Sequence, residues 1–132
     1  MIVLDASAFV DWLLQDPRTA DAVAGHMRTA RVLHSLDLVH VEVVSALRKH
    51  VAGRRLGASR AGLALDRLAA TPLRIHPTAP LVQRIWSLRA SHTSYDAAYV
   101  ALAERLRMPL ITTDGRLARS TGHRATIVEA SA

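Results

Sequence analysis

The chain begins with three apolar residues that lead directly to an acid, in the segment Ile2-Val3-Leu4-Asp5. An unbroken apolar run is typical of a strand covered on both faces, because such a strand has no solvent side along which polar residues would alternate. Open α/β sheets place their binding crevices at the carboxyl ends of the strands. We therefore expect the first strand to present Asp5 at the binding edge of a parallel sheet.

Strand-like and helix-like segments alternate after this strand, which predicts an α/β fold with a parallel, helix-covered sheet. Further strands are expected within 32–38, 73–76, 110–112 and 125–128. Helices are expected over 7–14, 19–31, 41–54, 58–70, 94–107 and 114–120, with one more beginning near Pro80. The start of the third helix is ambiguous, because Val39, Val41 and Val43 also alternate as in a strand.

The size of the chain limits the number of domains. With 132 residues, half of them apolar, it is large enough to bury one core, and we expect a single domain over 1–132. It has no cysteine, which excludes a disulfide framework and a thiolate metal site. No basic segment precedes the first apolar residues, and no apolar run approaches the roughly 18 residues of a membrane span. These features predict a soluble cytoplasmic protein.

Four of the eleven acids lie in otherwise apolar surroundings, namely Asp5, Glu42, Asp96 and Asp114. Carboxylates are rarely buried without a partner, because removing them from water is costly. Each acid also has a simpler interpretation: Asp5 and Asp114 could cap helices, Asp96 could lie in a first helical turn, and Glu42 could face solvent. Three of the four fall at a strand end or a helix start, however, and in a parallel sheet these positions share one edge. Together they predict a site for a hard divalent cation, Mg²⁺ or Mn²⁺.

The segments that carry these acids form four motifs in order along the chain. They are Leu4-Asp5-Ala6-Ser7, Val41-Glu42-Val43-Val44-Ser45-Ala46-Leu47-Arg48, Tyr95-Asp96-Ala97-Ala98-Tyr99-Val100-Ala101-Leu102-Ala103 and Thr112-Thr113-Asp114-Gly115-Arg116-Leu117-Ala118. The set closely resembles PIN-domain proteins, and more narrowly the VapC toxins of bacterial toxin–antitoxin pairs. The resemblance covers essentially the whole chain. It implies a three-layer sandwich with a five-stranded parallel sheet of order 3-2-1-4-5 and helices on both faces.

The resemblance also implies an activity, that of a Mg²⁺-dependent endoribonuclease in which metal-activated water hydrolyses RNA phosphodiester bonds. Carried over by motif, the catalytic and metal-binding acids are Asp5, Glu42, Asp96 and Asp114. The supporting residues are Ser7 and Thr113, which match small hydroxyl positions, and Arg116, which could brace a carboxylate or contact RNA. The expected products carry a 5′-phosphate and a 3′-hydroxyl.

The charge of the chain bears on the same expectation. Basic residues outnumber acidic ones by seventeen to eleven, and sixteen of them are arginine, whose planar fork suits phosphate. Solvated faces are an equally simple interpretation of charge alone. Because the resemblance implies an RNA substrate, we favour phosphate contact by the basic residues on two successive helices, above all Arg48, Lys49, Arg54 and Arg55.

Partner proteins are likewise implied by the resemblance. VapC-like toxins pair as homodimers and are held in hetero-oligomers by a VapB-like antitoxin, whose tail crosses the active-site face. Trp12, near the end of the first predicted helix, is a candidate lining of the groove for that tail. We expect no membrane partner.

Three other classes of protein share part of this pattern. A phosphoaspartate phosphatase needs a second acid two residues after the first, where this chain has Ser7. A receiver-type phosphoacceptor needs adjacent acids and a late lysine, and this chain has no lysine beyond Lys49. A catalytically inactive PIN-like module that binds RNA or regulates a partner is the remaining alternative, and the complete set of four acids counts against it.

Overall fold

The structure, a computed structural model, describes residues 1–131 and is built around one parallel sheet. Its strands are β1 (Ile2–Leu4), β2 (Leu33–Leu36), β3 (Arg74–His76), β4 (Leu110–Thr112) and β5 (Ile127–Glu129). They lie in the order β3-β2-β1-β4-β5, with every neighbouring pair parallel. The predicted α/β fold and strand order are confirmed, and the strand that leads to Asp5 occupies the centre of the sheet.

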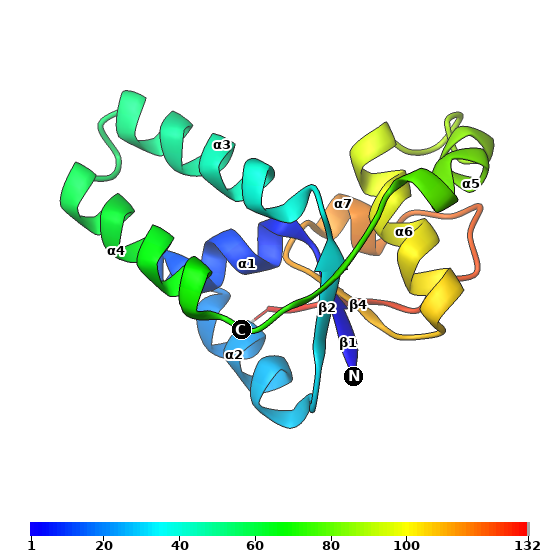
Figure 1. Cartoon of the computed structure of the whole chain (residues 1–132), viewed down its shortest axis with the longest axis horizontal. Coiled ribbons are helices and arrows are strands. Elements are labelled where there is room, and N and C mark those ends of the chain that lie inside the picture. Colours follow the sequence, from blue (N-terminus) through cyan, green and yellow to red (C-terminus); the bar gives the residue numbers. More distant parts are fainter. Residues whose placement is uncertain (132) are drawn as a thin grey trace.

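Helices cover both faces of this sheet (Figure 1). On one face lie α1 (Ala6–Leu13), α2 (Ala20–Thr29), α3 (Val39–Ala52) and α4 (Ala58–Ala70). On the other lie the 3₁₀ turn η1 (Ala79–Leu81), α5 (Val82–Ser87), α6 (Ser94–Leu106) and α7 (Gly115–Ala118). The ambiguous segment at Val39 is helical from its first residue, because Val39, Val43 and Leu47 bury one helical face in the core.

The two faces of the central strand supply two separate cores. Ile2 and Leu4 pack against α1, α3 and α4, whereas Val3 points to the other side and packs against α6. This alternation is the two-residue period of a strand, and it explains why all three positions are apolar. The strand is therefore held on both sides, and the residue that follows it has a fixed position.

The alanine residues of α6 allow this helix to lie close to the sheet. Ala97, Ala98 and Ala101 are buried, and α6 contacts β1, β2 and β4. The short side chains bring the first turn of α6 near the carboxyl end of β1.

In Figure 1, α3 and α4 instead form a helical hairpin that extends away from the sheet. Within residues 1–131, no helix is long and apolar enough to cross a membrane.

Candidate functional site

Asp5 is the most deeply buried of the four acids, with 4% of its surface exposed. Its backbone leaves the sheet in an extended conformation, and its side chain caps α1 by accepting a hydrogen bond from the amide of Ala8 at 2.9 Å. The simpler interpretation as a helix cap is therefore correct for this residue. Because the cap uses only Oδ1, it does not prevent Oδ2 from serving another purpose.

Two hydroxyl groups orient the Asp5 carboxylate. Ser7 donates from Oγ to Oδ1 at 2.7 Å, and Thr112 donates from Oγ1 to Oδ2 at 2.5 Å. These hydroxyls in turn accept backbone amides from the segment after β4, Ser7 from Thr113 at 3.2 Å and Thr112 from Asp114 at 3.1 Å. The two hydroxyls thus tie the strand ends of β1 and β4 together around Asp5.

Thr112, which the sequence motifs did not single out as a site residue, supplies one of these two hydroxyls. Ser7 takes part through its hydroxyl and Thr113 through its backbone amide, and the hydroxyl that reaches Oδ2 of Asp5 belongs to Thr112. Thr112 is fully buried at the end of β4. A signal was present in the sequence, since a threonine at the end of an otherwise apolar strand needs a polar partner.

Glu42 lies in the first turn of α3, on the other face of the sheet from α6. Its Oε1 accepts a hydrogen bond from the hydroxyl of Tyr99 at 2.8 Å. The predicted alternative of a freely solvated glutamate is therefore wrong, because this carboxylate is half-buried and bonded to a core residue.

Asp96 and Asp114 come from the starts of two helices. Asp96 lies in the first turn of α6, where its amide donates to the capping hydroxyl of Thr93 at 3.2 Å. Asp114 caps α7, with Oδ1 accepting the amides of Arg116 at 2.9 Å and Leu117 at 3.4 Å. As in Asp5, the cap occupies one carboxylate oxygen and leaves the second with free lone pairs.

The electrostatics show that the four acids share one region. Burial raises the pKa of Asp5 to about 6, against three hydrogen bonds that lower it, and the negative charge of Asp96 adds to the rise. Burial and the charge of Asp96 also raise the pKa of Glu42, while Tyr99 opposes this. The pKa of Asp96 is raised by burial and by the charge of Asp114. Asp96 is therefore the common neighbour of the other three acids, and its charge repels the charge of each of them.

The donor set of this cluster suits a hard cation. It consists of carboxylate oxygens. Glu42 and Asp114 are each anchored through one oxygen, and Asp5 is held through both. In the arrangement found over residues 1–131, no three His, Cys, Asp or Glu residues lie close enough together to hold a metal ion. A cation bound at this edge of the sheet would relieve the repulsion among these acids.

Arg116 and a small hollow lie beside Asp96. The hollow has a volume of about 160 Å³ and is lined by Ser91, His92, Thr93, Asp96, Arg116, Leu117 and Ser120. The positive charge of Arg116 lowers the pKa of Asp96, against the larger effects of burial and Asp114. Arg116 is thus placed next to the acids.

The other predicted RNA-contact residues lie apart from this hollow. Arg48 and Lys49 are exposed farther along α3, and Arg54 and Arg55 are exposed in the turn before α4.

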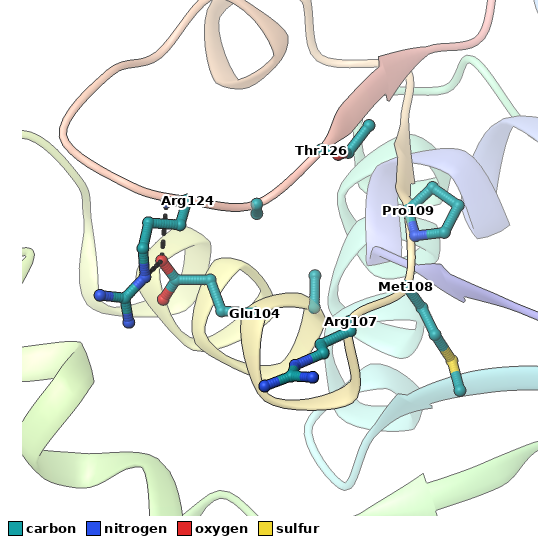
Figure 2. Close-up of a pocket in the computed structure, with 8 residues that line it drawn as sticks. Glu104, Arg107, Met108, Pro109, Arg124 and Thr126 are labelled. Carbon is teal, nitrogen blue, oxygen red and sulfur yellow. Dashed lines mark hydrogen bonds and ion pairs between the residues drawn. The ribbon is translucent and has the colours of Figure 1, made fainter.

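A larger hollow of about 440 Å³ lies at the opposite edge of the sheet, before β4 begins (Figure 2). Here Glu104 accepts hydrogen bonds from Arg84 at 2.8 and 2.9 Å and from the amide of Arg124 at 2.8 Å. Figure 2 shows Arg124 directed to Glu104. Because these arginines balance the charge of Glu104, the hollow contains no acids that repel each other. The contacts of Arg124 with Glu104 hold the segment before β5 against α6.

Comparisons with known proteins show the family of this chain. The family model of the PIN domain matches residues 2–122. Ribonuclease VapC12 of Mycobacterium tuberculosis is 44% identical over 127 residues, which cover 96% of this chain and 97% of the relative. Ribonuclease VapC9 of the same species is 41% identical over 117 residues, which cover 89% and 88%.

Solved structures show the same fold. PAE2754 from Pyrobaculum aerophilum superimposes with a TM-score of 0.69 at 23% identity, over 96% of this chain and 81% of the other. Mycobacterium tuberculosis VapC20, a Sarcin-Ricin loop cleaving toxin, gives a TM-score of 0.69 at 18% identity, over 94% and 99%. This chain belongs to the PIN-domain family and is a VapC-like member of it.

Proposed function

We propose that this protein is a Mg²⁺-dependent endoribonuclease that acts as the toxin of a VapBC-type pair. Its VapC relatives support the ribonuclease class and the toxin role. The observation that carries the metal dependence is the convergence of Asp5, Glu42, Asp96 and Asp114, from four different elements, on one edge of the sheet. There the charge of Asp96 raises the pKa of Asp5 and Glu42, and the charge of Asp114 raises the pKa of Asp96.

The four acids have different proposed roles in binding the ion. Asp5 and Asp96 are proposed to bind it most directly, while Asp114 and Glu42 complete its surroundings, partly through water. When bound, Mg²⁺ or Mn²⁺ lowers the pKa of a water molecule and neutralises charge that develops on the scissile phosphate. Ser7 and Thr112 keep the Asp5 carboxylate in one orientation through their hydrogen bonds. A fixed ligand needs no rearrangement during the reaction.

RNA binding is assigned to basic residues next to and beyond the acids. Arg116 lines the hollow beside Asp96, where a phosphate oxygen of the substrate can accept from its guanidinium. Arg48, Lys49, Arg54 and Arg55 are exposed along the α3–α4 hairpin and offer sequence-independent contacts to the RNA backbone.

A VapB-like antitoxin is the proposed protein partner, in a hetero-oligomer built on a homodimer of this chain. A hollow of about 390 Å³ between α1, α2 and α4 supports a peptide-docking role for Trp12, which lines it. Arg67 lies 4.3 Å above the centre of the Trp12 ring and lines the same hollow. The antitoxin is expected to cover this indole and to offer a cation to the acids.

RNA cleavage by the purified protein tests the proposal. We expect cleavage with Mg²⁺ that EDTA stops, and a loss of at least about 100-fold in Asp5→Asn. Asparagine retains the capping oxygen, so α1 keeps its N-cap. Asp66→Asn, at an exposed site on α4, is the matched control. A protein that cleaves nothing with Mg²⁺ but binds RNA in EDTA would instead be a catalytically inactive RNA-binding module.

A further inference from the structure

Tyr99 is a buried phenol that contacts the acidic site from the protein interior. It lies three residues after Asp96 on α6, so the two side chains are neighbours on one helical face. Its side chain is only 2% exposed and packs in the core between α6 and the sheet. Its hydroxyl donates to Oε1 of Glu42 at 2.8 Å. A buried phenol needs a polar partner, and here that partner is one of the four acids.

The bond between Tyr99 and Glu42 connects the two layers of helices. The helix that carries Glu42 is buried in the core on one face of the sheet, whereas α6 is buried in the core on the other face. Within residues 1–131 this is the one side-chain hydrogen bond between α3 and α6. It fixes the carboxylate of one layer to the helix of the other at the edge where the acids meet.

The bond also acts against a repulsion. Burial and the charge of Asp96 both disfavour an ionised Glu42, as the raised pKa of its carboxyl shows. The hydrogen bond from Tyr99 holds Oε1 of Glu42 in place against this repulsion. The Tyr99 hydroxyl is the donor of this bond and Glu42 the acceptor. The bond occupies Oε1 and leaves the lone pairs of Oε2 free.

We propose that Tyr99 is a positioning residue that holds Glu42 in the acidic cluster, with Oε2 available to a divalent cation or to a water bound to it. This inference rests on the proposed function, because a shared cation gives the held oxygen its ligand. The same side chain also fills the core. Tyr99→Phe separates the two roles, since it keeps the ring and removes only the hydroxyl.

Mn²⁺ affinity of the full chain, measured by isothermal titration calorimetry, tests the proposal through a double-mutant cycle of Y99F and E42Q. We expect Y99F to weaken Mn²⁺ binding about 10-fold in the wild-type background and less than about 2-fold in the E42Q background. Tyr95→Phe removes an exposed hydroxyl from the same helix and is the matched control, with unchanged affinity. A melting temperature of Y99F close to that of the wild type shows that the core is intact.

The possible results distinguish the positioning role of Tyr99 from the proposed function. If the wild type binds Mn²⁺ and Y99F binds it equally well, or if Y99F weakens binding equally in both backgrounds, the positioning role is overturned and the proposed function stands. If the wild type binds no Mn²⁺, both fail. Should Y99F not fold, E42D replaces it, because the shorter side chain cannot reach Tyr99 and the ion together. E42D is expected to bind Mn²⁺ about 10-fold more weakly, and wild-type affinity would overturn the proposal.

Discussion

The hydroxyl of Thr112 donates a hydrogen bond to Oδ2 of Asp5 at 2.5 Å, although 107 residues separate them in the sequence. The same hydroxyl accepts the backbone amide of Asp114 at 3.1 Å. One buried side chain therefore joins the first acid of the chain to the last of the four. This relation places Thr112 between the two strand ends that carry Asp5 and Asp114.

Thr112→Val should destabilise the protein and impair the site. Valine keeps the shape of the side chain but leaves the amide of Asp114 and Oδ2 of Asp5 without this partner. We expect the free energy of unfolding to fall by about 1–3 kcal/mol and RNA cleavage to fall about 10-fold, measured by urea denaturation and by a cleavage assay.

Thr113→Val is the matched control for this prediction. Thr113 contacts Ser7 through its backbone amide, which the substitution retains. Its unfolding free energy should stay within about 0.5 kcal/mol of the wild type. If T113V impairs the site as much as T112V does, the assignment of the supporting hydroxyl to Thr112 is wrong.

Stability in EDTA should depend on pH through Asp5. Its pKa is about 6 in the folded protein, above its ordinary value of 3.8, so the folded state binds this proton more tightly than the unfolded chain. Ionising Asp5 therefore destabilises the fold above about pH 6, and this penalty is absent below about pH 4. Relative to Asp5→Asn, the wild type should lose up to about 3 kcal/mol of unfolding free energy from pH 4 to pH 7. A difference between the two proteins that is constant across this range would contradict the buried, repelled carboxylate.

Glu104→Gln should affect stability without affecting the metal site. The guanidinium of Arg84 lowers the pKa of Glu104, and their two hydrogen bonds hold α5 to α6. Loss of the charged acceptor should cost about 1–2 kcal/mol in unfolding free energy. The stability that this ion pair adds is present above the ordinary pKa of Glu104 and is lost as the pH falls through its lowered pKa. Mn²⁺ affinity should remain that of the wild type, and a marked loss would mean that the two edges of the sheet are coupled.

The α3–α4 hairpin should contribute to RNA binding through charge alone. The double variant Arg54→Ala with Arg55→Ala is made in the Asp5→Asn background, which is expected not to cleave RNA. The slope of log affinity against log salt concentration should become smaller by about 0.7 for each phosphate that these arginines neutralise. Fluorescence anisotropy with a labelled single strand measures this slope. Arg28→Ala with Arg31→Ala, also exposed, is the control pair. Equal slopes for the two double variants would contradict RNA binding by Arg54 and Arg55.

The features of the site that could be predicted from the sequence are those that depend on the local path of the backbone. An apolar run ending in Asp5 and the alanine pattern of α6 each indicate where a backbone must lie, and the boundaries of α4 and β4 agree with the prediction. The partners of side chains are different, because they depend on which elements meet. Tyr99 bonds Glu42 across 57 residues, and the strand that brings Thr112 to Asp5 is fixed only by pairing β1 with β4. A buried threonine needs a polar partner, but no local pattern shows that this partner is Asp5.

The most direct test of the central claim is whether Asp96, the common neighbour of the other acids, is needed for a divalent cation to bind. Thermal unfolding with and without Mg²⁺ measures this for the wild type, Asp96→Asn and the control Asp66→Asn. At about 100 times the dissociation constant, a bound ion should stabilise the wild type and the control by about 2.7 kcal/mol, and Asp96→Asn should gain almost nothing. An unchanged melting temperature of the wild type, or an equal rise in Asp96→Asn, would contradict a cation shared by the four acids.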